Sequence, residues 1–261
     1  MGGHKPSHTE DVPQMANPMD FVTPSQLVDL PSLGKYPEGH PLCGQDTIEI
    51  KYMTAKDEDI LTSRSLLKKG LAIDRLIQNL IKDKSIDSKS LYLGDRNAII
   101  IHARASAYGD EYRTKVQCPS CGETSKYTFD LANYEMYHGD NTDGLDIEYT
   151  ENGTYKVTLP LSGIEAEVKP LTGHDEIAML KNSKTKDTAE NLITKQMKRF
   201  TVGFNGYYDQ KTINYVCDNM VARDSSFLRN IFKVISPDLI LSDLFVCSNC
   251  EHEEEMTVPF G

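Results

Sequence analysis

The sequence lacks the features that mark several large classes of protein. No apolar run approaches the roughly 18 residues that a membrane-spanning helix requires. The opening residues, MGGHKPSHTE, place no apolar stretch behind a basic one, so we expect no secretory signal there. No cluster of Lys and Arg exceeds a pair, and the net charge is −11. This charge balance disfavours both nucleic acid and anionic membrane as partners.

Motifs of catalysis are missing as well. We find no nucleophile elbow, phosphate-binding loop or metal-hydrolase motif. The stretch HGDNTDGLD (138–146) resembles a calcium loop, but its acidic residues miss the required alternate spacing and no Glu closes it. His102 lies within an Ile-rich segment, where a core or groove histidine is expected more than a catalyst. We therefore predict no catalytic residues and a protein that is not an enzyme.

What the sequence does contain is a doubled cysteine motif. VQCPSCGE holds Cys118 and Cys121, and LFVCSNCEHEEE holds Cys247 and Cys250. A short alternating stretch, typical of a strand, flanks each pair on both sides. Four thiolates in two such turns are the ligand set of a tetrahedral Zn²⁺ in a zinc ribbon. With four thiolates the coordination shell is closed, so the predicted zinc ion would be structural.

The long separation of the two pairs predicts an inserted unit. Residues 122–246 lie between them, and closing such a loop costs on the order of 4 kcal/mol. A structural zinc site contributes an apparent ~10–16 kcal/mol, which exceeds that cost. The chain must therefore leave and return near one place, as a folded insertion would.

Three other interpretations of the cysteine pairs stay open at this stage. They could be redox disulfides, disulfides of a secreted protein, or ligands of two separate metals. Gly122 suits the positive φ that is common after the second Cys. Glu251 stands at the matching place in the second pair, and its side chain disfavours positive φ. His252 could substitute as a ligand, although a solvent-facing role is favoured. Cys43 and Cys217 lack partners at metal spacing and are predicted to be free thiols.

The remaining chain predicts an α+β fold with four parts. Residues 1–45 contain seven prolines and are interpreted as an extended arm that contacts a neighbouring subunit, with a disordered tail as the alternative. Residues 46–110 form a strand and helices, and residues 111–131 and 241–261 form the two halves of the zinc ribbon. Residues 132–240 hold an inserted β-meander followed by helices.

Local signals place the boundaries of these elements. Thr54, Asp95 and Asp224 are each expected to cap a helix, and Gly109 to end one. Tight turns are expected at residues 152–153 and 162–163, within the meander. Residues 188–240 are predicted to be helical in pieces, with breaks at GFNG (203–206) and near Pro237.

Six stretches stand out together along the chain: LPSLGKYP (30–37), MTAKDEDIL (53–61), GDRNAIIIHARASAYGDEY (94–112), CPSCGE (118–123), VARDSSFLRNIFKVISPD (221–238) and CSNC (247–250). In this order they resemble a known family, the baseplate hub assembly proteins of contractile-tail phages of the T-even type. The specific feature is the combination of the Gly-Asp-Arg helix start, the Tyr-Gly-x-x-Tyr lead-in and the split cysteine pairs. The chain departs from the pattern at CSNCEH, where relatives have Cys-Pro-x-Cys-Gly.

The resemblance implies a structural part of the phage baseplate hub, assembled in the host cytoplasm and located in the virion tail. Its partners would be other baseplate, hub or tail-tube proteins, and an oligomer within the assembly is expected. A transient hub assembly chaperone that is not retained in the virion is the nearest alternative. A nucleic-acid-binding zinc ribbon is a lower one, because the net charge opposes it.

Overall fold

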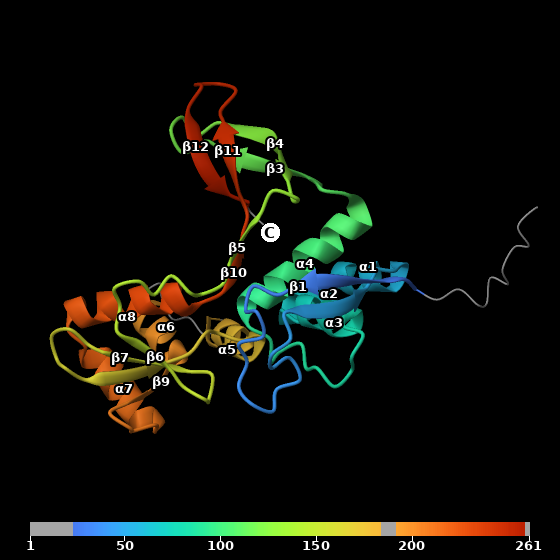
Figure 1. Ribbon diagram of the computed structural model, residues 1–261. Coiled ribbons are helices and arrows are strands. Elements are labelled where there is room, and N and C mark those ends of the chain that lie inside the picture. Colours follow the sequence, from blue (N-terminus) through green and yellow to red (C-terminus); the bar gives the residue numbers. More distant parts are fainter. Residues whose placement is uncertain (1–22, 184–191, 259–261) are drawn as a thin grey trace, which may run out of the picture.

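The computed structural model describes residues 23–183 and 192–258, which form a mixed α and β protein with small antiparallel sheets (Figure 1). The first lobe, at the lower right of Figure 1, joins one strand pair to four helices. Its strands are β1 (Ser25–Asp29) and β2 (Thr47–Lys51), and its helices are α1 (Ala55–Thr62), α2 (Arg64–Lys69), α3 (Ala72–Leu80) and α4 (Leu93–Tyr108).

The second lobe is an insertion built on an antiparallel sheet of order β6-β7-β8-β9. The strands are β6 (Ile147–Tyr149), β7 (Tyr155–Thr158), β8 (Glu165–Val168) and β9 (Thr201–Phe204). Helices α6 (Leu192–Phe200), α7 (Gln210–Asn219) and α8 (Ala222–Ile235) belong to this lobe, and α5 (Gly173–Ser183) lies between the lobes (Figure 1). The lobe has its own buried core, in which Phe200, Leu228 and Ile231 are fully buried.

Two strand hairpins stand above the lobes and bring distant parts of the chain together (Figure 1). One pairs β3 (Glu111–Gln117) with β4 (Thr124–Asp130), and the other pairs β11 (Ser242–Val246) with β12 (Glu253–Thr257). Below them, β5 (Glu135–Tyr137) pairs with β10 (Asp238–Ile240), so the chain leaves for the insertion and returns at one place. The hairpins share a continuous core with the first lobe.

The expected N-terminal arm differs from the structure. Residues 1–22 of it lie outside the described residues, but residues 25–45 are part of the first lobe. The alternation in SQLVDL lets β1 pair with β2 in register, with Val28 opposite Ile48. Val28 and Leu30 are then completely buried, and Leu42 nearly so. Burial of these apolar side chains outweighs the preference of the nearby prolines for an extended, solvated chain.

The expected helix caps at Asp95 and Asp224 are also corrected. α4 begins at Leu93 and α8 at Ala222, so each Asp is the third residue of its helix. Both carboxylates instead accept hydrogen bonds from other segments: Asp95 from Ser32 and Tyr36, and Asp224 from the backbone N–H groups of residues 161 and 162. Thr54 is the N-cap of α1 as expected, and α4 ends before Gly109, whose φ is +83°.

The meander is larger than the sequence predicts. The hairpins around residues 150–154 and 159–164 form as expected, linking β6, β7 and β8. The segment expected to be a helix break at 203–206 overlaps a fourth strand, β9, which pairs with β8 across an irregularity between Glu167 and Val168. A four-residue strand bounded by helices carries too short an alternation to be recognised without its partner.

Candidate metal centre

The two cysteine turns have the same backbone hydrogen bonds. In the first turn, the Cys118 N–H donates to the Glu123 carbonyl (2.8 Å) and the Gly122 N–H to the Cys118 carbonyl (2.9 Å). In the second, the Cys247 N–H donates to the carbonyl of residue 252 (2.9 Å) and the Glu251 N–H to the Cys247 carbonyl (3.0 Å). Gly122 and Glu251 occupy matching places with φ of +74° and +57°. The two turns are therefore equivalent knuckles, despite different sequences.

Aromatic packing between the hairpins sets the position of one knuckle against the other. Phe129 on β4 and Phe245 on β11 are fully buried. The Tyr127 ring lies edge-on to both, at 4.7 Å from Phe129 and 5.4 Å from Phe245 between ring centroids. The Tyr127 hydroxyl also donates to the Leu244 carbonyl on the other hairpin (2.7 Å). The inner faces of the hairpins thus form a small core that brings the cysteines together.

The four predicted cysteines converge at the end of this core. Cys118 Sγ lies 3.7 Å from Cys250 Sγ, and Cys121 Sγ lies 3.7 Å from Cys247 Sγ. All four sulfur atoms lie within 4.8 Å of one another. A tetrahedral Zn²⁺ with bonds of about 2.3 Å to sulfur separates its ligands by about 3.8 Å. The cluster is therefore compatible with a metal ion, and the cysteines are free thiols, not disulfides.

The pKa values of two of the thiols, Cys121 and Cys250, also suit a nearby cation. The backbone N–H of Glu123 and the side chain of Asn249 lower the pKa of Cys121 to about 6. At Cys250 the backbone N–H of residue 252 lowers the pKa, but burial and the neighbouring thiols outweigh it and raise the pKa to about 12. The Cys121 thiolate therefore forms readily, whereas ionisation of Cys250 beside the other thiols is unfavourable. A bound cation would stabilise the negative charge on both.

Asn249 is a contributor that the sequence analysis missed. Its backbone N–H donates to Cys247 Sγ (3.4 Å), and its side-chain amide lies 3.6 Å from Cys121 Sγ on the other knuckle. Such second-layer donors orient sulfur ligands and stabilise their negative charge. The only signal in the sequence is its position inside the second Cys-x-x-Cys, where many residue types are compatible with the turn.

The other candidate side chains lie outside the cluster. His252 Nε2 faces the Glu254 carboxylate at 3.4 Å, and the imidazole is not among the clustered groups. Cys43 is exposed, and Cys217 is buried in the insertion, where burial raises its pKa to about 11. His102 is half-buried beside Tyr134, edge-on at 5.6 Å. The structure therefore brings together the four predicted cysteines and leaves the weaker candidates apart.

The side chains of His40 and Ser90 lie close together, but their hydrogen bonds are not those of a catalytic nucleophile and its general base. His40 Nε2 lies 2.8 Å from Ser90 Oγ, but His40 Nδ1 accepts the Leu42 N–H (3.1 Å). Nε2 therefore carries the ring proton, and Ser90 donates its own proton to the Asp87 carbonyl (2.8 Å). With these directions His40 cannot remove the Ser90 proton.

Fold and cluster together define a class: a two-lobed α and β protein in which four cysteines from separate parts of the chain meet at one point. Across the described residues, no helix combines the length and hydropathy that crossing a membrane requires. A comparison with curated proteins gave no match, and neither did one with solved structures. The family model described as T4 bacteriophage base plate protein matches residues 24–261. The chain belongs to this family of phage baseplate proteins, which implies a location in the virion tail.

Proposed function

We propose that the protein is a structural component of the hub region of a contractile-tail baseplate, and that its four cysteines hold a structural zinc ion. The observation that carries the proposal is the convergence of four thiols in a chain whose family model covers nearly all of it. Family membership supports contacts with other phage structural proteins. The hub location and assembly in the host cytoplasm rest on the sequence resemblance described above.

A role without catalysis is part of the same proposal. Four thiolates around one ion leave no position for water or substrate, so such a zinc ion would contribute stability and shape. The ion would also join the two hairpins, because each hairpin supplies two ligands. A reducing host cytoplasm would keep the thiols available for binding.

The metal is tested by measuring zinc in purified protein. We expect one zinc per chain in the native protein and none in Cys118→Ser or Cys247→Ser, because three thiolates and a hydroxyl bind the ion far more weakly. Cys43→Ser is the matched control, since this exposed cysteine lies outside the cluster and the variant should keep its zinc. Native protein that lacks bound metal after purification without chelators would contradict the zinc proposal.

The location is tested by mass spectrometry and cryo-imaging of purified virions. We expect the chain in finished particles, within the hub of the baseplate and in contact with other tail proteins. If it is instead present during assembly and absent from finished particles, the protein is an assembly chaperone and the structural role is wrong. Binding to DNA or RNA in a gel-shift assay at physiological salt would support the nucleic-acid alternative.

A further inference from the structure

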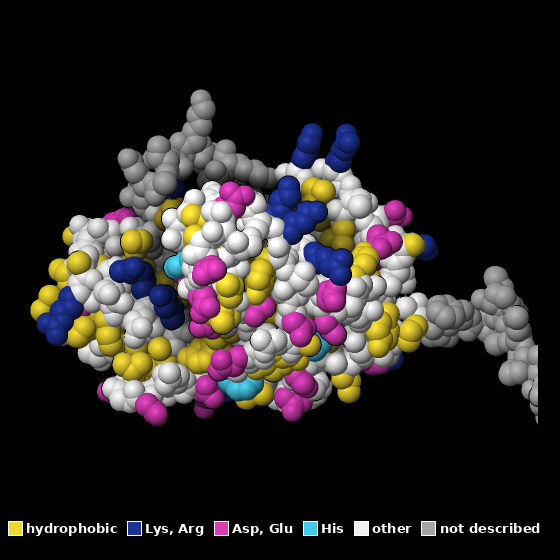
Figure 2. Space-filling model, turned by 90° about the horizontal axis from the view of Figure 1, so that it is seen from above, with side chains coloured by type: hydrophobic (Ala, Val, Ile, Leu, Met, Phe, Trp, Pro, Cys, Tyr) yellow, Lys and Arg dark blue, Asp and Glu magenta, His cyan; other side chains and the backbone are white. Residues whose placement is uncertain are grey.

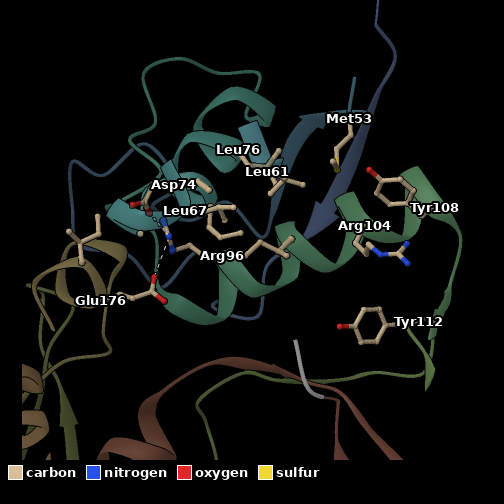
Figure 3. Close-up of a pocket in the computed structure, with 15 residues that line it drawn as sticks. Met53, Leu61, Leu67, Asp74, Leu76, Arg96, Arg104, Tyr108, Tyr112 and Glu176 are labelled. Carbon is tan, nitrogen blue, oxygen red and sulfur yellow. Dashed lines mark hydrogen bonds and ion pairs between the residues drawn. The ribbon is translucent and has the colours of Figure 1, made fainter. Parts of the chain in front are cut away.

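An apolar groove of about 580 Å³ crosses the first lobe between α1–α3 and α4. Its walls include Met53, Leu61 and Leu76, and the Tyr108 ring stands at one end (Figure 3). Leu67 on α2 is 55% exposed and Tyr108 51%, so the walls keep much of their apolar surface in water. Apolar surface gathered in a hollow of this kind marks a contact site for another macromolecule.

Cationic side chains stand beside this groove. Arg104 lines it from α4, with its guanidinium over the Tyr108 ring at 4.7 Å (Figure 3). Arg64 and Lys69 on α2 are exposed and flank the groove residue Leu67 in sequence. In the part of the chain that the structure describes, none of these three cations forms an ion pair with a carboxylate. Figure 2 shows Lys and Arg side chains around a hollow with hydrophobic side chains in it.

The acidic residues that line the groove are already paired. The Arg96 guanidinium donates to Asp74 Oδ1 (2.6 Å) and to Glu176 Oε2 (3.3 Å). Among the described residues that line the groove, the charge left without a partner is therefore that of Arg104. In a chain of net charge −11 this is a local positive potential, which favours an occupant that is partly apolar and partly acidic.

The second cysteine hairpin carries a surface of that complementary character. On β11, Leu244 and Val246 point away from the buried Phe245 and are 54% and 45% exposed. Their cross-strand partners on β12 are Glu255 and Glu253, which are both exposed. Within the described ranges, neither carboxylate forms an ion pair with a Lys or Arg. This face therefore presents two apolar side chains beside two free negative charges.

We propose that the β11–β12 face of one copy of the chain docks into the groove of a second copy. Within one molecule the hairpin and α1–α3 lie well apart, so the hairpin does not fill its own groove (Figure 1). In the docked pair, Leu244 and Val246 lie against the apolar walls, and the β12 carboxylates face Arg104 and the cations of α2. Because the two surfaces differ, each added copy leaves one groove and one hairpin open, and association continues head to tail. The contact goes beyond the proposed function, which names no interface.

The association state of the purified protein tests the proposal. Analytical ultracentrifugation at about 100 µM detects contacts with micromolar dissociation constants. We expect dimers and larger species, and an association about tenfold weaker when salt rises from about 50 to about 500 mM. Leu67→Asp and Leu244→Asp should each be monomeric, because a charge replaces an apolar contact. Leu161→Asp is the matched control, since Leu161 is 59% exposed on the insertion, and it should associate as the native protein does.

Mixing the two variants separates this contact from other modes of association. Leu67→Asp keeps an intact hairpin and Leu244→Asp an intact groove, so the mixture should form dimers and stop there. Circular dichroism and the zinc content of each variant show whether its fold is intact. A native protein that stays monomeric, a folded variant that associates normally, or a mixture without dimers would each overturn the proposal.

Photo-crosslinking locates the contact. The crosslinking residue p-benzoylphenylalanine replaces Leu67 in a mixture of ¹⁴N- and ¹⁵N-labelled chains, which identifies crosslinks between copies by mass spectrometry. We expect crosslinks from position 67 to residues 242–257 of another copy. The same residue at Leu161 should give no crosslink to that segment. Crosslinks from position 67 that reach other residues only would place a different surface in the groove and contradict the proposal.

Discussion

At the scale of single residues, buried aspartates connect helices to the rest of the molecule. Five helices carry Asp as their third residue, where a negative charge is favourable beside the helix N-terminus. All five are buried, and most of their hydrogen bonds go to side chains or loops outside the helix. These residues are Asp57 of α1, Asp74 of α3, Asp95 of α4, Asp175 of α5 and Asp224 of α8.

Asp95→Asn should destabilise the protein by about 2–3 kcal/mol, measured by urea unfolding. Asp95 accepts the Ser32 N–H (3.0 Å), the Ser32 hydroxyl (2.7 Å) and the Tyr36 hydroxyl (2.6 Å). An amide would turn an NH₂ group toward at least one of these donors and leave it unsatisfied. Asp59→Asn on the exposed face of α1 is the matched control and should change stability by less than about 0.5 kcal/mol. Similar losses in both variants would contradict this account.

Asp175 should make stability depend on pH. Burial raises its pKa, but donation from Lys169 Nζ (2.7 Å) and from the Thr172 backbone (3.0 Å) outweighs burial, so the pKa lies below its ordinary value of 3.8. Its stabilisation is therefore complete above about pH 5 and is lost as the pH falls through the folded-state pKa. We expect Asp175→Asn to cost about 1–2 kcal/mol at pH 7, with the difference from native protein shrinking as the pH falls below about 4. Urea unfolding from pH 7 to 3 measures this, and a difference constant with pH would refute it.

At the scale of elements, the two knuckles adopt the same positive-φ conformation with different residues, Gly122 and Glu251. Gly122 has an open surrounding, since nothing lies within 4 Å of an added Cβ, so only its positive φ requires glycine. Glu251 adopts the same conformation with a side chain, at a cost of about 1–2 kcal/mol for a non-glycine residue. The second knuckle is therefore the more strained of the two.

Substitutions at these two positions should differ in their effect on hydrogen exchange. We expect Gly122→Ala to speed amide exchange in β3 and β4 about five- to thirtyfold, because Ala disfavours positive φ. Glu251→Gly should leave exchange in β11 and β12 unchanged or slower, since relief of strain opposes the greater freedom of glycine in the unfolded chain. Exchange is followed by mass spectrometry with zinc present. Faster exchange in Glu251→Gly, or no change in Gly122→Ala, would show that backbone strain does not limit the knuckles.

The elements also show what the sequence can and cannot predict. Short-range signals were sufficient for both cysteine hairpins, for the meander turns and for the end of α4, because each depends on neighbouring residues. β1 and β9 were missed because each is short and gains its stability from a partner strand elsewhere. Asp95 and Asp224 were misassigned as caps because their partners lie about 60 residues away in sequence. The convergence of the four thiols could be predicted from their number and spacing. The role of Asn249 as a donor to the sulfur atoms is visible only in the folded knuckles.

At the scale of the whole molecule, the described residues form two separate cores. The insertion buries its own side chains between its sheet and helices, while the hairpins share the core of the first lobe. β5 and β10 are the strands that join the insertion to the hairpins, and the paired segments have only three residues each. Stability of the hairpins should therefore depend on the proposed zinc more than stability of the insertion does.

Metal removal should separate these contributions. We expect a chelator to abolish exchange protection in residues 111–130 and 242–257, where the two hairpins are held by shared ligands. Protection in β7, β8 and α8 should persist, because Val157, Ala166 and Ile231 belong to a core that lacks the cysteine cluster. Hydrogen exchange with and without chelator measures both regions at once. Simultaneous loss of protection everywhere would show that the molecule is one cooperative unit.

The pairing of one cysteine turn before the insertion with another after it also fixes an order of events on the ribosome. Cys118 and Cys121 emerge early in synthesis, but their partners appear only once the entire second lobe has been translated. A nascent chain interrupted within the insertion is therefore left with half a cluster and an uncovered hairpin. A chain that ends within the insertion therefore cannot bring four cysteines together, whereas one that extends past Cys250 can.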